Sequence, residues 1–343
     1  MLDDLKFIHE RDAEDALGLA EKQWQQLQHD YQFSFHPERE IQNVVVAGMG
    51  GSALAALIAQ SWPGVSVPFE IVREYDIPRY VGANTLFIAS SFSGNTEETL
   101  TALTRAEERG AIIVCVSHAG RLQEIARERG YPYIELPAAT QPRYAAFYGF
   151  RAFLEVVVAA GLAGHEVIDE LVAASEWLKE QSAQWATTVP TAKNQAKSLA
   201  QELMGKSIVV YSGPKLYPAA YNWKISFNEN AKQVAWVNQY PEFNHNEFLG
   251  WTKQPVHKPY AVIDIRSNLE HERVQKRFEV SERLLSGVRP APEIVRPEGD
   301  TLVRQLLWAI TLGNFTSLYL ALLNNLNPSP VDIIEKLKKS LDD

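Results

Sequence analysis

The chain has 343 residues, of which 46% are hydrophobic, and it carries a formal net charge of −9 with a pI near 5.5. This length and apolar content suffice for about two domains at roughly 150 residues each. The acidic balance argues against a broad basic footprint for nucleic acid or anionic lipid, so any anionic partner is expected to be a small molecule.

The first predicted element is an amphipathic helix over residues 13–32. The opening sequence, MLDDLKFIHERDAEDAL, is acidic and has no long apolar stretch, which argues against a secretory signal. We therefore expect a soluble, cytoplasmic protein with no membrane partner.

Short apolar runs then alternate with helical stretches, which is typical of a parallel sheet whose strands are joined by crossover helices. The expected strands cover residues 43–48, 69–74, 85–91, 111–117 and 133–136. A long helix over residues 143–162 closes this half of the chain. The single cysteine, Cys115, falls in the fourth strand, so it cannot form an intrachain disulfide and is expected to be an inert core thiol.

A helical stretch over residues 165–205, broken at Pro190 and ended at Gly205, leads to a second alternation. Strands are expected over residues 207–213, 233–237, 260–265 and 293–297, and helices over residues 217–232, 269–285 and 302–326. The last helix is apolar but contains polar groups that are too numerous for a bilayer span, namely Arg304, Gln305, Asn314 and Asn324. The sequence therefore predicts two βα halves.

The turn after the first strand, AGMGGSALAAL, allows two interpretations. A dinucleotide pattern, G-x-G-x-x-G/A followed by distant carboxylates, is represented by Gly48, Gly50, Ala53, Glu70 and Glu74. Gly51 and Ser52 instead add a small residue and a hydroxyl, which suit a monophosphate bound to the exposed N–H groups of a helix. This motif alone leaves both ligands open.

The turn after the third strand, ASSFSGNTEETL, is rich in hydroxyl groups. Four of them fall within seven residues, on Ser90, Ser91, Ser93 and Thr96. An ordinary helix cap, for which Asn95 and Glu98 have capping-box spacing, needs one hydroxyl and not four, so we favour an anion site. The carboxyl ends of neighbouring strands in a doubly wound sheet would bring both turns to one pocket. A phosphorylated metabolite needs this second turn, whereas a dinucleotide does not.

Together with the later segments FNENAK and PEFNHNEFLGW, these turns make most of the chain resemble the sugar isomerase (SIS) domain proteins, and closely the bifunctional phosphoglucose/phosphomannose isomerases. The resemblance implies an α/β fold with two flavodoxin-like, doubly wound SIS domains with parallel sheets, plus N-terminal and C-terminal helices. The implied domains are residues 1–160 and 161–343. The implied ligands of the substrate phosphate are Gly50, Gly51, Ser52, Ser91, Ser93 and Thr96.

The resemblance also implies an aldose-ketose isomerase that interconverts glucose 6-phosphate or mannose 6-phosphate with fructose 6-phosphate through a cis-enediol. This reaction needs a base that moves a proton between C1 and C2 and an acid that opens the sugar ring. By resemblance Glu229 is the base, and His245 with Lys336 opens the ring. Arg143 would stabilise the enediolate oxyanion. The family implies a homodimer with the active site at the interface and His245 as a candidate for donation by the partner chain.

One segment departs from the family pattern. The loop NPSP is shorter than the family's N-P-x-x-T-P, and Ser329 replaces the threonine credited with accepting both C2 epimers. Lys336 keeps the family's spacing of six residues after Pro330. Which epimer is preferred therefore stays open.

Cofactor chemistry finds no support in the sequence. There is no H-x-H or H-E-x-x-H spacing for zinc and no Walker A sequence for ATP, so we expect neither a metal nor a cofactor. Two alternatives remain. One is a non-catalytic sugar-phosphate-binding regulator, although the acidic N-terminus lacks a basic helix-turn-helix segment for nucleic acid. The other is a nicotinamide-dependent dehydrogenase, which NAD would protect against heat.

Overall fold

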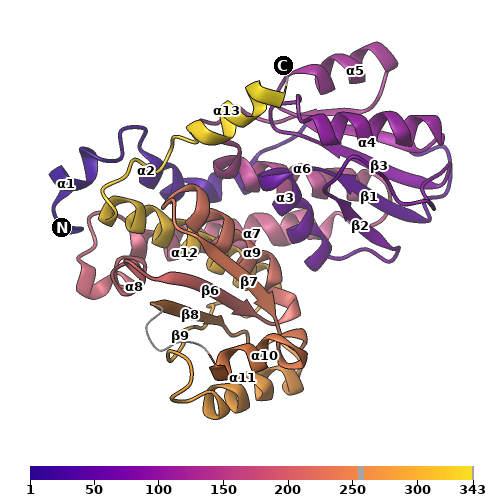
Figure 1. Cartoon of the computed structure of the whole chain (residues 1–343). Helices are drawn as coiled ribbons and strands as arrows, with labels where there is room; N and C mark the ends of the chain where they lie inside the picture. The colour runs from indigo at the N-terminus through magenta and orange to yellow at the C-terminus, as the bar shows by residue number, and fades with distance from the viewer. Residues whose placement is uncertain (254–258, 342–343) are drawn as a thin grey trace. The chain divides into compact units, whose positions relative to one another are not determined.

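The structure is a computed structural model that describes residues 1–253 and 259–341, and the chain forms two compact units (Figure 1). The first unit consists of Lys22–Lys179, and the second unit combines Met1–Glu21 with Glu180–Asp343. The boundaries of these units differ from those of the predicted domains, residues 1–160 and 161–343. The opening residues pack with the second unit, which periodicity along the chain does not reveal.

The first unit contains a five-stranded parallel sheet in the order β2-β1-β3-β4-β5. Its strands are β1 (Asn43–Ala47), β2 (Phe69–Val72), β3 (Thr85–Ser90), β4 (Ile112–Ser117) and β5 (Tyr133–Glu135). All five expected strands are confirmed. The order is that of flavodoxin-like folds, in which the carboxyl ends of the first and third strands are neighbours at the topological switch point.

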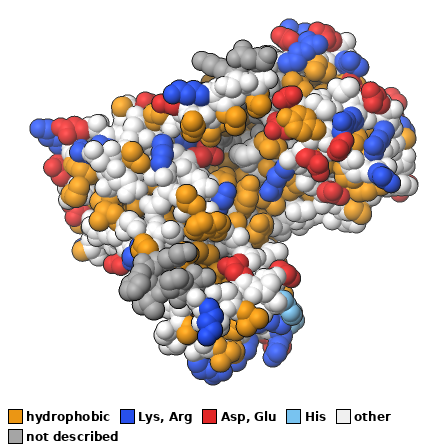
Figure 2. All heavy atoms as spheres, viewed as in Figure 1, with side chains coloured by type: hydrophobic (Ala, Val, Ile, Leu, Met, Phe, Trp, Pro, Cys, Tyr) orange, Lys and Arg blue, Asp and Glu red, His pale blue; other side chains and the backbone are white. Residues whose placement is uncertain are grey.

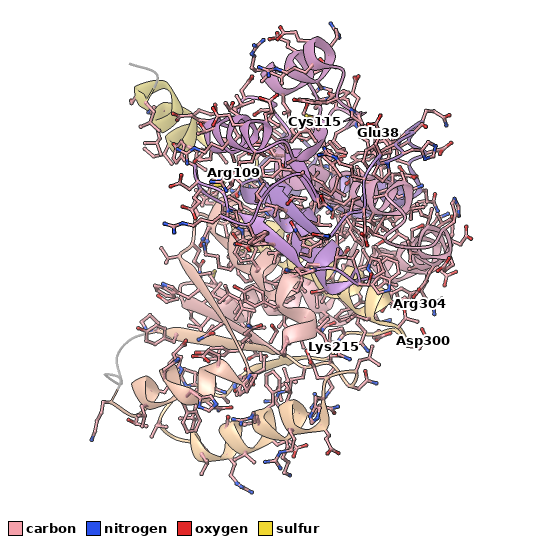
Figure 3. All side chains as sticks on the ribbon, turned by 90° about the vertical axis from the view of Figure 1, so that its right-hand side faces the viewer. Glu38, Arg109, Cys115, Lys215, Asp300 and Arg304 are labelled. Carbon is pink, nitrogen blue, oxygen red and sulfur yellow. The ribbon has the colours of Figure 1, made fainter. Side chains whose placement is uncertain are left out.

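Helices cover both faces of this sheet. α3 (Gly50–Ser61) and α6 (Ala146–Ala159) pack together on one face, whereas α4 (Glu97–Glu108) and α5 (Arg121–Arg129) cover the other. Because β3 and β4 are buried on both sides, their sequences are continuous apolar runs and do not alternate with polar residues. Cys115 lies in this core as expected, and burial raises the pKa of its thiol to about 12 (Figure 3).

The single amino-terminal helix expected over residues 13–32 is wrong. Within that range the chain forms two short pieces, α2 (Ala16–Glu21) and the 3₁₀ helix η1 (Gln23–Gln28), and a separate helix, α1 (Leu5–His9), precedes it. The carboxylate of Asp12 accepts hydrogen bonds from the N–H groups of Ala16 at 2.8 Å and Leu17 at 2.9 Å, which starts α2. Asp15 has a φ of 51°, a left-handed conformation that a continuous helix cannot include.

The helical stretch after residue 165 is broken more extensively than the expected break at Pro190. Its pieces are α7 (Glu166–Ser182), η3 (Ala183–Trp185), η4 (Thr191–Lys193) and α8 (Gln195–Leu203). Asn194 starts α8, because its Oδ1 accepts a hydrogen bond from the Lys197 N–H at 3.1 Å. Gly205 follows the end of α8 with a φ of 73°, which confirms the predicted stop.

The second unit contains a four-stranded parallel sheet in the order β7-β6-β8-β9, and the four expected strands are confirmed. They are β6 (Ser207–Ser212), β7 (Ala235–Gln239), β8 (Tyr260–Ile265) and β9 (Glu293–Val295). α9 (Tyr217–Glu229), α8 and α12 (Leu302–Leu323) pack together on one face, and α11 (Glu272–Leu284) covers the other. Figure 2 shows Lys and Arg side chains gathered over α11, which carries exposed Arg273, Lys276 and Arg283.

α12 is the apolar helix predicted near the end of the chain. It has the length and hydropathy of a membrane span, but 89% of its most apolar window is buried inside the protein. Trp223 Nε1 donates a hydrogen bond to Ala309 O at 2.7 Å, and any side chain at Gly313 would overlap the Trp223 indole. Arg304 pairs with Asp300 at 2.8 Å at the start of the helix (Figure 3). These contacts identify α12 as the core helix of the second unit.

Candidate active site

The turn between β1 and α3 lies against the end of β3. α3 begins at Gly50, which has a φ of 50°. A Cβ atom placed on Gly48 would lie 3.0 Å from Ser90 O and 3.3 Å from the Ser52 Cβ. The close approach therefore favours glycine at position 48. It also confirms that the glycine turn and the hydroxyl-rich turn share one edge of the sheet.

The hydroxyl-rich turn is internally hydrogen-bonded. Ser91 Oγ lies 2.7 Å from Thr96 Oγ1 and 3.5 Å from Ser93 Oγ. Ser91 Oγ also accepts the Gly94 N–H at 3.1 Å, and Ser93 Oγ accepts the Asn95 N–H at 3.3 Å. The three hydroxyls that were expected to hold a phosphate are therefore grouped at one point.

The helix-cap alternative for this turn is wrong. The residue that precedes α4 is Thr96, and its side chain makes no capping hydrogen bond. Asn95, which had the spacing of a capping box, instead accepts the N–H of Arg121 through Oδ1 at 2.9 Å. The backbone N–H groups at the start of α4 are thus not capped by either side chain, as an anion site requires.

A third turn, between β4 and α5, packs against the hydroxyl-rich turn. Gly94 has a φ of 71°, and a side chain there would overlap Ala119 O. The His118 N–H donates to Phe92 O at 3.0 Å, and the two rings stack with centroids 5.5 Å apart. Sequence reasoning did not single out His118, although a polar residue directly after a buried strand is the signal that could have found it.

Arg143 lies beside the glycine turn. It belongs to the 3₁₀ helix η2 (Pro142–Ala145), which leads into α6. A Cβ atom on Gly51 would lie 3.1 Å from Pro142 O and 3.5 Å from the Arg143 Cα. The side chain is only 7% exposed, and its guanidinium carbon lies 4.6 Å from the centre of the Tyr144 ring. The first unit therefore brings together the two turns that carry the six expected phosphate ligands and the short helix that carries Arg143.

Glu229 is the last residue of α9 and is partly buried. Asn230 follows it and donates through Nδ2 to Ser317 Oγ at 2.9 Å. Lys232, with a φ of 51°, donates through Nζ to Asn327 O at 3.0 Å and Pro328 O at 2.9 Å. The polar residues around Glu229 therefore join the end of α9 to the NPSP loop, and they fix the backbone that carries the carboxylate.

Glu229 and His245 lie at opposite ends of the strands in the sheet of the second unit. Asn228, next to Glu229, accepts the N–H of Ala235 at the first residue of β7 at 2.9 Å. His245 is exposed in η6 (Glu242–His245), which follows the other end of β7. The length of β7, about 13 Å at roughly 3.3 Å per residue, therefore separates the two edges. The second unit does not bring Glu229 and His245 of one chain together.

Lys336 lies on the last helix, α13 (Asp332–Leu341), and is exposed. The predicted apolar stripe of this helix, Ile334, Leu337 and Leu341, is exposed as well. Within residues 1–253 and 259–341 no group of three His, Cys, Asp or Glu side chains could hold a metal ion.

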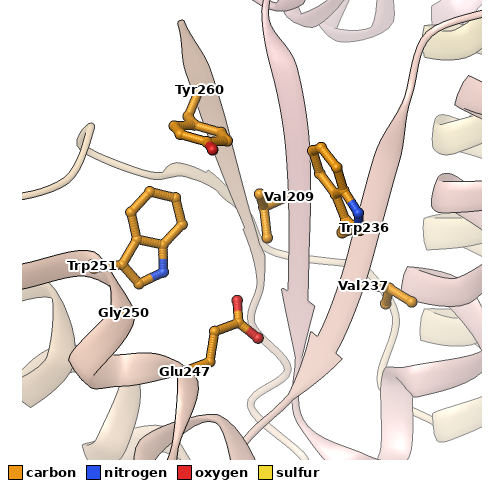
Figure 4. Close-up of a pocket in the computed structure, with 7 residues that line it drawn as sticks. All are labelled: Val209, Trp236, Val237, Glu247, Gly250, Trp251 and Tyr260. Atoms are coloured by element: carbon orange, nitrogen blue, oxygen red, sulfur yellow. The ribbon is translucent and has the colours of Figure 1, made fainter. Parts of the chain in front are cut away.

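The second unit also has a pocket of about 320 Å³ beside the segment that carries His245 (Figure 4). Its lining residues are Val209, Trp236, Val237, Glu247, Gly250, Trp251 and Tyr260. None of the predicted site residues lines it. Glu247 is two residues from His245, and its carboxylate is directed toward β6.

Comparisons with known proteins identify the family of the chain. Residues 192–341 match the family described as bacterial phospho-glucose isomerase C-terminal SIS domain. The chain is 34% identical over 307 residues to the bifunctional phosphoglucose/phosphomannose isomerase of Caldicellulosiruptor bescii, which covers 88% of this chain and 90% of that protein. It is 31% identical over 301 residues to the protein of the same name from Aquifex aeolicus, with 87% and 90% covered.

Solved structures share the fold over the whole chain. A glucose-6-phosphate isomerase like protein from Thermus thermophilus superimposes with a TM-score of 0.65 at 19% identity, over 98% of each chain. The tagatose-6-phosphate ketose/aldose isomerase of Escherichia coli gives a TM-score of 0.64 at 15% identity, over 94% of this chain and 91% of that one. At these identities the structures show a common architecture. With the sequence relatives, they show that the chain belongs to the family of bifunctional phosphoglucose/phosphomannose isomerases.

Proposed function

We propose that the protein is an aldose-ketose isomerase that interconverts glucose 6-phosphate or mannose 6-phosphate with fructose 6-phosphate. The observation that carries the proposal is the contact between the two turns of the first unit, with Gly48 against Ser90. This contact groups hydroxyls and helix N–H donors at a switch point, where α/β proteins bind ligands. We further propose that the enzyme is soluble and cytoplasmic and serves glycolysis or gluconeogenesis.

The substrate phosphate would be held at the junction of the two turns. Its proposed ligands are Gly50, Gly51, Ser52, Ser91, Ser93 and Thr96. Hydroxyl and N–H donors to an ionised phosphate form charge-assisted hydrogen bonds, which are roughly twice as strong as neutral ones. The hydrogen bonds that now link the three hydroxyls would be exchanged for bonds to phosphate oxygens. Tyr80 Oη already donates to Glu70 at 2.6 Å, which disfavours Glu70 as the ribose ligand of a dinucleotide.

The chemistry would be carried by four side chains. His245 and Lys336 would open the sugar ring, and Glu229 would then move the proton between C1 and C2 through a cis-enediol. Arg143 would stabilise the enediolate, whose charge develops only near the transition state. No metal and no cofactor take part in this scheme.

We propose that the active enzyme is a homodimer with its active site at the interface. The positions of Glu229 and His245 at opposite edges of one sheet support this arrangement, because the two residues of one chain are too far apart to act on one sugar. His245 would then be donated by the partner chain.

Turnover assays test the proposed activity directly. We expect conversion of glucose 6-phosphate, and separately of mannose 6-phosphate, to fructose 6-phosphate without added NAD or metal. Glu229→Gln is expected to lower kcat by at least about a hundredfold, because loss of a general base costs that much. Glu202→Gln, an exposed carboxylate of α8, serves as the matched control. Binding of sugar phosphate without turnover would support a regulator instead, and activity of Glu229→Gln within tenfold of the parent would remove Glu229 as the base.

A further inference from the structure

The segment that carries His245 contains little regular structure of its own. Its elements are η6, the four-residue helix α10 (Glu247–Gly250) and the 3₁₀ helix η7 (Trp251–Lys253). Such short helices are not stable by themselves. His245 is nevertheless exposed at the surface of the second unit, so its position depends on side chains that anchor the segment.

Glu247 is the central anchor. Its Oε2 accepts a hydrogen bond from Asn238 Nδ2 on β7 at 2.7 Å, and its Oε1 accepts the hydroxyl of Tyr211 on β6. Figure 4 shows the carboxylate directed from α10 toward the strands. Both oxygens are therefore bound to donors on the sheet, and the segment is joined to two neighbouring strands at one point.

Tyr211 extends this connection. The residue is fully buried, and its hydroxyl accepts a hydrogen bond from Trp251 Nε1 at 2.9 Å while it donates to Glu247. Burial and the charge of Glu247 raise the pKa of Tyr211, so the hydroxyl keeps the proton that it donates. Tyr211 thus holds α10 and η7 together.

A second anchor lies on the other side of His245. Asn244 donates through Nδ2 to Ser281 Oγ at 2.8 Å and accepts from Arg277 Nη1 at 3.2 Å, and both partners belong to α11. Phe243, in the same segment, is fully buried. The residues on either side of His245 are therefore fixed, while the imidazole itself faces outward.

We propose that Glu247 is a positioning residue for His245, holding the imidazole in the geometry needed for ring opening in the active site of a second copy of the chain. This inference rests on the role of His245 under the proposed function. It predicts that a defect at Glu247 slows the opening of cyclic substrates and leaves phosphate binding intact, because positioning errors affect the reacting groups and not the remote anchor.

A swap of donor and acceptor between Glu247 and Asn238 tests the proposal. In Glu247→Gln the amide offers one acceptor oxygen in place of two, so either Asn238 or Tyr211 loses the acceptor of its hydrogen bond, whichever way the amide is turned. In Asn238→Asp two carboxylates face each other. The double variant Glu247→Gln with Asn238→Asp restores one donor facing one acceptor. We expect each single variant to lower kcat/KM for fructose 6-phosphate by at least about tenfold, and the double variant to recover most of that loss.

Binding of a linear five-carbon aldonic acid 5-phosphate, which needs no ring opening, provides the second readout. Its Kd is expected to stay within about twofold of the parent value in all three variants. Glu279→Gln, an exposed carboxylate of α11, is the control for charge, and the melting temperature of each variant reports whether it is folded.

The outcomes distinguish the positioning role of Glu247 from the proposed ring-opening role of His245. If His245→Ala retains full turnover, the proposed ring-opening role of His245 is wrong. If His245→Ala is impaired while Glu247→Gln is as active as the parent, the positioning role is wrong and the proposed function stands. Failure of the double variant to recover while it remains folded also overturns the positioning role.

Discussion

At the scale of single residues, Gly94 shows how one backbone conformation fixes the candidate phosphate site. It has a φ of 71°, and a side chain there would overlap Ala119 O, which supports the turn from the β4–α5 loop. Gly110, at the end of α4, has a similar φ of 70° but has nothing within 4 Å of an added Cβ. Substitutions at the two glycines therefore distinguish two effects. Backbone strain applies to both positions, whereas overlap with a neighbouring loop applies to Gly94 alone.

We expect Gly94→Ala to raise the KM for fructose 6-phosphate by at least about tenfold, because the turn that groups Ser91, Ser93 and Thr96 must shift. It should also lower the free energy of unfolding by more than Gly110→Ala, for which we expect about 1 kcal/mol from strain alone. Steady-state kinetics and urea unfolding measure the two effects. Equal KM values for both variants would contradict this role of the turn.

The hydroxyls of this turn could be predicted from sequence because their number exceeds what a helix cap needs. The function of Gly94 could not, since it depends on Ala119 in another turn that follows a different strand. The same limit applies to Glu247. Its carboxylate is one of many in an acidic chain, and only the hydrogen bonds from Tyr211 and Asn238 distinguish it.

At the scale of elements, the two sheets differ at their corresponding turns. In the second unit the turn after β6 contacts the carboxylate of Glu270, a residue in the loop after β8. Lys215 N donates to Glu270 Oε1 at 2.8 Å, and the Lys215 side chain donates to Leu269 O at 2.7 Å (Figure 3 labels Lys215). A side chain on Gly213 would overlap the same carboxylate. In the second unit a carboxylate of the protein therefore occupies the position that corresponds to the proposed phosphate site of the first unit.

Burial raises the pKa of Glu270 above its usual value near 4.5. The folded protein thus binds this proton more tightly than the unfolded chain, so the stability that the group contributes at low pH is lost as the pH rises through the folded pKa. We expect Glu270→Gln, which does not titrate, to gain stability relative to the parent as the pH rises from about 4 to about 7. Urea unfolding at each pH measures the difference. The exposed Glu272→Gln should show a smaller trend, and a flat difference for Glu270→Gln would contradict the assignment.

The regular elements could largely be predicted from pattern. All nine expected strands form, because buried parallel strands are continuous apolar runs that glycine-rich turns delimit. The bounds of the amino-terminal helix could not be predicted, because the apolar periodicity that indicates it includes Asp15. The carboxylate of Asp12 and the left-handed backbone of Asp15 set the start of α2 at Ala16, three residues later than predicted, and periodicity indicates neither.

At the scale of the whole molecule, the candidate catalytic residues of the second unit are divided between two edges of one sheet. Asn228, the neighbour of Glu229, is hydrogen-bonded to the first residue of β7, and His245 lies six residues after the last residue of that strand, Gln239. A motif along the chain shows that both residues are present but does not show the distance between them. One sugar bound near Glu229 is therefore out of reach of His245 from the same chain, and a site that uses both needs two chains.

Mixing two inactive variants tests this arrangement. In a mixed dimer of Glu229→Gln and His245→Ala chains, one of the two interface sites combines an intact Glu229 with an intact His245. Equal amounts that exchange at random give half mixed dimers, so activity should return to about a quarter of the parent value. A mixture of Glu229→Gln with a chain that carries both substitutions contains no complete site and should stay inactive. If the first mixture also stays inactive although mixed dimers form, His245 acts on the site of its own chain, and α9 and the segment after β7 would have to approach each other by a distance comparable with the length of that strand.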